Sequence, residues 1–252
     1  MLTYRCATFC DFLIAIKPQA MPTANPTDIL DLLTEFPHAA GAFAEMRRYV
    51  KLVSQFADFP SAQATVRMKA ELNRTSDPVR EGELKYEIEV AEQDARNTVP
   101  RIVWGSILVA TYATYETGVK NVLIHWSRNV PGALGFDCKR TGQFLKTATA
   151  YAANEVGIAL FPSAELKAVV LELKSLRDSF AHAAGQMPSR RTELHSSIDK
   201  SCARGYPIVV EDNNWIAPPR AVAFYLLKAE RAYKSFSDAV LERYMLRMGV
   251  AT

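Results

Sequence analysis

Two side chains close together in the chain have the chemistry needed to act on a phosphodiester. Arg177 carries a planar guanidinium that can donate two parallel hydrogen bonds to a phosphate, and His182 carries an imidazole, a side chain that can accept or donate a proton. They lie in the stretch Ser-Leu-Arg-Asp-Ser-Phe-Ala-His-Ala-Ala-Gly, residues 175–185. The pair predicts stabilisation of charge and transfer of a proton at a phosphate, chemistry that needs no metal ion.

The element that must position both groups is a helix that begins near Ser163 and ends just past His182. Ser163 is a suitable N-cap, Gly185 is suited to a left-handed C-terminal cap, and Pro188 prevents the helix from continuing. Apolar residues recur between these limits at helical spacing: Leu166, Val169, Val170, Leu173 and Leu176. The sequence therefore predicts one amphipathic helix here.

The spacing of the two groups does not by itself bring them together. At about 100° per residue, side chains five positions apart point roughly 140° apart on an ideal helix. If Arg177 and His182 act on one phosphate, either the last helical turn is distorted or another chain completes the site.

Residues 176–185 closely resemble the motif of the HEPN superfamily, in which an arginine and usually a polar residue precede a histidine. Arg177 and His182 match the two defining positions, and Asp178 stands where Asn is commoner. The stretch Ala-Thr-Tyr-Glu-Thr-Gly-Val-Lys, residues 113–120, resembles the second conserved helix of these proteins, where Tyr or Trp precedes a Glu. The two segments occur in the order that the family shows.

This resemblance implies an all-α fold, a HEPN-like helical bundle, here with a small β-hairpin insertion. It also implies a homodimer in which two motifs face a shared cleft, without a cofactor. The implied activity is metal-independent endoribonuclease cleavage by attack of the 2′-hydroxyl, in a toxin or phage-defence effector. Arg177 and His182 would be catalytic, and Asp178 and Glu116 supporting. Other members only bind RNA or a partner protein, so a non-catalytic HEPN module is the alternative.

The roles of the two supporting carboxylates have competing interpretations. Glu116 lies in the strongest apolar segment, residues 101–126, which is predicted to be the central helix opened by Pro100. Because a buried carboxylate is costly without a cation, we expect Glu116 to pair with Arg177; the alternative is a solvated pair with Lys120 one turn on. Asp178 orients the neighbouring arginine or histidine, or simply faces water.

A polar, basic loop is expected after Gly185, next to these residues. Four cations of this stretch are weak candidates for RNA binding: Arg190, Arg191, Lys200 and Arg204. A serine hydrolase using Ser179 with His182 is a third interpretation, but the sequence has no nucleophile elbow to favour it.

The rest of the chain divides into three predicted parts. Residues 1–26 are expected to be an N-terminal extension and linker, 27–78 an N-terminal helical segment, and 79–248 the bundle. Helices are expected over the ranges 28–33, 41–56, 61–75, 81–97 and 141–152, and after Pro218-Pro219. A hairpin is expected from residues 206–210 and 214–216.

Composition limits the class of protein. Of 252 residues 49% are apolar and 23% charged, which is typical of a globular protein, and the net charge of +3 neither requires nor excludes RNA. The four cysteines lack the paired spacing of a zinc site and indicate a reduced, cytoplasmic protein.

The longest uncharged run, residues 102–115, is too short to span a bilayer, so no membrane is expected as a partner. The expected partners are RNA, a second copy, and an antitoxin or defence-system protein.

Overall fold

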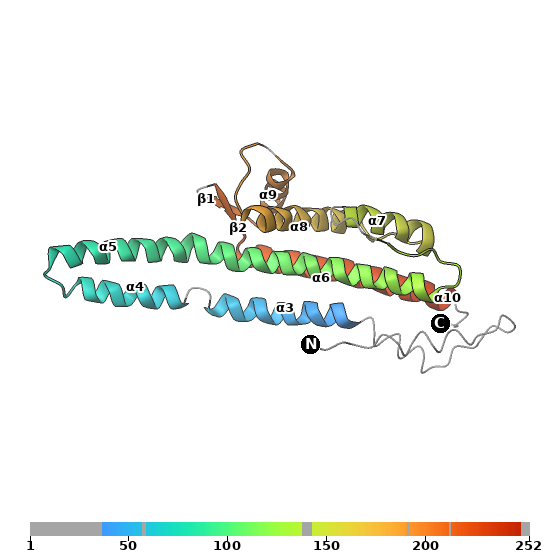
Figure 1. The fold of residues 1–252 in the computed structure, drawn as a ribbon, viewed down its shortest axis with the longest axis horizontal. Helices are drawn as coiled ribbons and strands as arrows, with labels where there is room; N and C mark the ends of the chain where they lie inside the picture. The colour runs from blue at the N-terminus through green and yellow to red at the C-terminus, as the bar shows by residue number, and fades with distance from the viewer. Residues whose placement is uncertain (1–36, 57–58, 138–142, 191, 212, 248–252) are drawn as a thin grey trace.

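The computed structural model describes residues 37–56, 59–137, 143–190, 192–211 and 213–247, and most of them are helical (Figure 1). This confirms the all-α class. The α-helices are α3 (Pro37–Phe56), α4 (Phe59–Leu72), α5 (Pro78–Gln93), α6 (Val99–Asn129), α7 (Phe144–Tyr151), α8 (Ala164–Ala183), α9 (Glu193–Ala203) and α10 (Pro219–Arg247). The predicted extension 1–26 and the helix expected over 28–33 lie outside the described residues.

Pro100 lies in the first turn of α6, as expected, but no break separates α6 from the helix before it. α5 continues through a π-helical turn, η1 (Asp94–Thr98), directly into α6, and the three form one rod in Figure 1. Val99 donates its N–H to the carbonyl of Asp94, five residues back, which widens the turn just before the proline. A proline in a regular α-helix clashes with the carbonyl four residues earlier, and the wider turn accommodates it.

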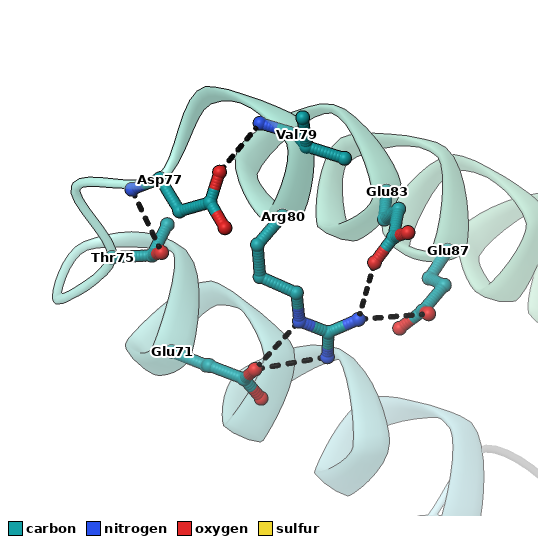
Figure 2. A network of polar contacts seen from close by, with 7 residues as sticks. All are labelled: Glu71, Thr75, Asp77, Val79, Arg80, Glu83 and Glu87. Carbon is teal, nitrogen blue, oxygen red and sulfur yellow. Dashed lines mark hydrogen bonds and ion pairs between the residues drawn. The ribbon is translucent and has the colours of Figure 1, made fainter.

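The turn between α4 and α5 is closed by polar contacts centred on Arg80 (Figure 2). Arg80 donates to Glu71 from Nε at 3.0 Å and from Nη2 at 2.9 Å. Its Nη1 donates to Glu83 and Glu87 at 3.1 and 3.4 Å, and Asp77 caps α5 through the backbone N–H two residues on. Exposed pairs of this kind each contribute little stability, but together they hold the turn that falls between the helices expected over 61–75 and 81–97.

α6 is the centre of the bundle, and α3, α8 and α10 pack around it. The large side chains that mark this helix in the sequence are all buried: Trp104, Leu108, Tyr112, Tyr115, Val119, Val122, Leu123 and Trp126. The apolar character lies nearly all round the helix in the sequence, but at about 100° per residue the buried side chains share one side of it, and Ile102, Ser106 and Lys120 on the opposite side are exposed. Phe43 of α3 is fully buried, and its ring centroid lies 6.0 Å from that of Tyr233 on α10. Within the predicted N-terminal segment, α3 thus contributes to the same core.

The expected basic loop after Gly185 is largely a helix, so that prediction was wrong. Residues 193–203 form α9, which packs on α8 and buries Leu194 and Ile198, four residues apart. Charged and polar residues occupy one side of this stretch and apolar residues the other. Burial of the apolar side stabilises the helix.

The small hairpin is confirmed. Strands β1 (Val209–Glu211) and β2 (Asn214–Ile216) pair antiparallel, with Val210 opposite Trp215. The hairpin leads directly into α10, which lies along α6 and α8. α9 and the hairpin both lie near the C-terminal end of α8 in Figure 1, next to the candidate residues.

Candidate functional site

α8 begins and ends close to where the sequence predicts. Ser163 accepts a hydrogen bond from the N–H of Leu166 at 3.2 Å, and the helix continues to Ala183. The predicted left-handed cap takes two residues, because Ala184 and Gly185 have φ angles of 49° and 85°. All five residues of the predicted apolar stripe are buried: Leu166, Val169, Val170, Leu173 and Leu176.

α8 runs antiparallel to α6 along one face of each helix. Three contacts mark the alignment, taken in order along α8: Arg177 with Tyr112, Phe180 with Gly105, and Gly185 with Arg101. The α6 partners recur at helical spacing, and Glu116 continues the same face one turn beyond Tyr112. The C-terminal end of α8 therefore lies beside the N-terminal end of α6.

Arg177 and Glu116 form the ion pair that was one of the two predicted alternatives. Nη2 of Arg177 lies 3.0 Å from Oε2 of Glu116, and both side chains are 25% exposed. The guanidinium carbon also lies 4.4 Å from the centre of the Tyr112 ring, a cation–π geometry. Lys120, the alternative partner, is exposed. The two segments that resemble the HEPN family are thus in direct contact.

A second carboxylate completes this cluster. Asp178 lies 2.8 Å from Nη1 of Arg177 and 2.6 Å from Nζ of Lys174, so it orients the arginine rather than facing water alone. Two cations and two carboxylates therefore offset one another. Burial raises the pKa of the Glu116 carboxyl above its ordinary value, and the neighbouring Arg177 opposes part of that rise. Burial likewise raises the pKa of the Tyr112 phenol.

His182 does not join this cluster. Its side chain is exposed and, within the described ranges, makes no hydrogen bond or ion pair. α8 keeps α-helical geometry through Ala183, so the last turn is not distorted toward Arg177. A distorted last turn was one way for Arg177 and His182 to act on the same phosphate, and this geometry does not provide it. The other way requires a second chain.

The turn after His182 is held in place by the hairpin. Trp215 donates its backbone N–H to the carbonyl of Gly185 at 2.9 Å and its indole Nε1–H to Oγ of Ser179 at 3.0 Å. The rings of Trp215 and Phe180 meet edge to face at 6.0 Å. Ser179 therefore serves as an acceptor for Trp215, and its contacts give no support to a serine nucleophile paired with His182.

Arg101 lies at the same end of α8, and the sequence interpretation did not single it out. Its Cγ and Cδ lie 3.4 Å from the position that a Cβ on Gly185 would occupy. Its Nε is buried without a hydrogen-bond partner. The sequence does contain a signal for Arg101. Positions 101, 105, 108, 112 and 116 recur at helical spacing, which places Arg101 on the face of α6 that carries Glu116.

The four weak RNA-binding candidates have different surroundings. Arg190 and Lys200 are exposed, and Arg191 lies outside the described residues. Arg204 makes a close ion pair with Glu172 of α8, which is only 3% exposed, and its Nη2 donates to that carboxylate at 3.0 Å. These contacts assign Arg204 to the junction of α8 and α9.

The described ranges contain no group of three or more His, Cys, Asp or Glu side chains placed to hold a metal ion. Within the same ranges, no helix combines the length and apolar character needed to cross a membrane.

No family model, curated protein or solved structure matches this chain. The functional expectation therefore depends on the two short segments that resemble the HEPN superfamily and on the contact between them.

Proposed function

We propose that the chain is a metal-independent endoribonuclease of the HEPN type, acting as a homodimer. The observation that carries the proposal is the ion pair of Arg177 with Glu116, which joins the two segments that resemble the family. A cytoplasmic toxin or phage-defence effector, held in check by an antitoxin or a defence-system partner, is the setting that the resemblance implies.

In the proposed reaction the nucleophile belongs to the substrate. The 2′-hydroxyl oxygen of a ribose bonds to the adjacent phosphorus, and the bond from phosphorus to the 5′-oxygen of the next nucleotide breaks. The products are a 2′,3′-cyclic phosphate and a 5′-hydroxyl. One imidazole accepts the proton of the 2′-hydroxyl, and a second delivers a proton to the leaving oxygen. Two copies of His182, one from each chain of a dimer, supply these roles.

Arg177 would stabilise the charge that develops on the non-bridging oxygens. A guanidinium has five N–H donors, and the ion pairs with Glu116 and Asp178 engage Nη2 and Nη1. Donors therefore remain for a phosphate oxygen, while the two carboxylates hold the planar group in one orientation. The dimer is part of the proposal because α8 directs Arg177 and His182 to different sides of the helix.

A second candidate is a non-catalytic HEPN module that binds RNA or a partner protein. One observation favours it: Arg177 lies between two carboxylates whose charge offsets its own. In that case neither His182 nor Arg177 would contribute to a reaction, although either could still lie in a binding surface.

The test is cleavage of single-stranded RNA by the purified protein in excess EDTA, with the termini of the products identified by mass spectrometry. The nuclease proposal expects 2′,3′-cyclic phosphate ends, loss of cleavage in His182→Ala and Arg177→Ala, and retained cleavage in the matched control His195→Ala on α9. Sedimentation measures the expected dimer.

Two outcomes would contradict the nuclease proposal. Cleavage that survives the combined Arg177→Ala and His182→Ala substitutions would show that these residues do not catalyse it. Binding of RNA without any cleavage would support the non-catalytic module instead. Expression in cells adds an independent readout, because an active ribonuclease slows growth and His182→Ala relieves that effect.

A further inference from the structure

We propose that Arg101 binds an RNA phosphate next to the one that is cleaved, an inference that rests on the proposed function. Arg101 lies on the first turn of α6, and its side chain crosses Gly185 at the end of α8. Gly185 follows His182 by three residues, so Arg101 brings a positive charge to the turn that carries the histidine.

The first support for this assignment is the state of the neighbouring cations. Arg177 and Lys174 are paired with carboxylates of the cluster, and Arg204 is paired with Glu172. Arg101 makes no ion pair with any residue in the described ranges, and its Nε is buried without a partner. A guanidinium held at a fixed place without a counter-charge is suited to a phosphate, and here the donors would be the two Nη groups, because Nε is buried.

The second support is the way Arg101 is held. Its aliphatic carbons pack against Gly185, whose φ of 85° and lack of a side chain leave room for them. The carbonyl of Gly185 already accepts a hydrogen bond from Trp215. The arginine stem is thus supported by packing, and the donors at its end remain available for a ligand.

The ligand class is the backbone of single-stranded RNA rather than a particular base. A guanidinium that binds phosphate contributes equally for all sequences, and the contact weakens as salt increases. Arg101 would thereby position the strand, so that its neighbouring phosphodiester lies at the histidine. It is a substrate-binding residue in this scheme, not a catalytic one.

The test compares Arg101→Met, which keeps an unbranched apolar stem but removes the charge, with Arg128→Met at the other end of α6. Binding of a fluorescent single-stranded RNA is measured in a His182→Ala background over a range of salt concentrations. Arg101→Met should bind about tenfold more weakly. Its plot of log affinity against log salt should be less steep by about 0.7, the value for one lost phosphate contact on a single strand. Arg128→Met should match the parent in both.

Cleavage kinetics with His182 present separate binding from chemistry. Arg101→Met should raise KM and leave kcat within about twofold. Arg101→Lys should recover part of the affinity, which a purely structural role would not predict. If Arg101→Met unfolds at lower temperature than the parent, Arg101→Gln provides the same comparison.

The outcomes distinguish this inference from the proposed function. If the protein cleaves RNA and Arg101→Met leaves affinity, salt slope and KM unchanged, the Arg101 assignment is wrong and the nuclease proposal stands. If the protein binds RNA without cleaving it and Arg101→Met weakens binding, the assignment holds for the non-catalytic module. If the protein neither binds nor cleaves RNA, both proposals are wrong.

Discussion

The ring of Phe180 on α8 occupies the space where any residue other than glycine at position 105 of α6 would place its Cβ. That Cβ would lie 2.2 Å from Cε2 of the ring, far inside van der Waals contact. Gly105 thus lets α6 and α8 approach closely, between the Arg177–Glu116 pair on one side and the Arg101–Gly185 contact on the other.

Gly105→Ala should therefore lower the free energy of unfolding. Overpacking should destabilise the fold by about 1–3 kcal/mol, and the better helix propensity of alanine should offset about 1 kcal/mol of that loss. The matched control is Gly82→Ala on α5, where no atom lies within 4 Å of the added Cβ, and it should raise stability by about 0.5–1 kcal/mol. Urea denaturation measures both. Equal stabilisation by the two variants would contradict the close packing of Phe180 on α6.

The ion pair of Arg177 and Glu116 should be energetically coupled. A double-mutant cycle with Arg177→Ala and Glu116→Ala should give a coupling energy of about 1 kcal/mol, because both side chains are mostly withdrawn from water. The same cycle on the exposed pair Glu81 and Lys85 of α5 should give below about 0.5 kcal/mol. Chemical denaturation supplies the stabilities of the wild type, the four single mutants and the two double mutants. A coupling near zero for the first pair would mean that the contact does not persist in solution.

Glu116 should also make stability depend on pH in a definite direction. Its pKa is raised in the folded state above the ordinary value of 4.5, so the folded chain binds more protons than the unfolded chain between these two values. The stability of the wild type relative to Glu116→Gln should therefore increase as pH falls through the raised pKa, and level off below 4.5. Thermal unfolding of both proteins over the acid range checks the sign, and the opposite trend would mean that Arg177 outweighs burial.

We expect Arg204 to stabilise the folded chain through its ion pair with Glu172. Glu172 is 3% exposed, and Arg204→Ala leaves this nearly buried carboxylate without a cation and with only a long hydrogen bond from the Tyr225 hydroxyl at 3.5 Å, which should cost about 3 kcal/mol. Lys200→Ala, on the exposed side of α9, should change stability by less than about 0.5 kcal/mol. Urea unfolding compares the two. A small effect of Arg204→Ala would return this residue to the list of candidates for RNA contact.

Local patterns in the sequence predicted much of the fold. The apolar spacing and the Ser163 and Gly185 signals located α8, and the continuous apolar character of residues 101–126 identified the central helix. Pro100 lies in the first turn of the central helix, as expected, but the π-helical turn that joins α5 to α6 without a break was not indicated by the sequence. One error came from considering charges without the apolar residues between them. The basic residues before Arg204 were expected in a loop, although Leu194 and Ile198 give that stretch a buried side.

The chain alone determined which chemical groups are available: a guanidinium and an imidazole five residues apart, on a helix whose ends are marked by its own caps. Only the tertiary structure decided their surroundings, because hydrogen bonds and burial depend on residues that are distant in sequence. In the folded chain Arg177 pairs with Glu116, 61 positions away, and Arg204 pairs with Glu172. Arg101 lies against the turn after His182. Side-chain spacing along one helix cannot specify which residues another helix presents to it, since that follows from how the whole core packs.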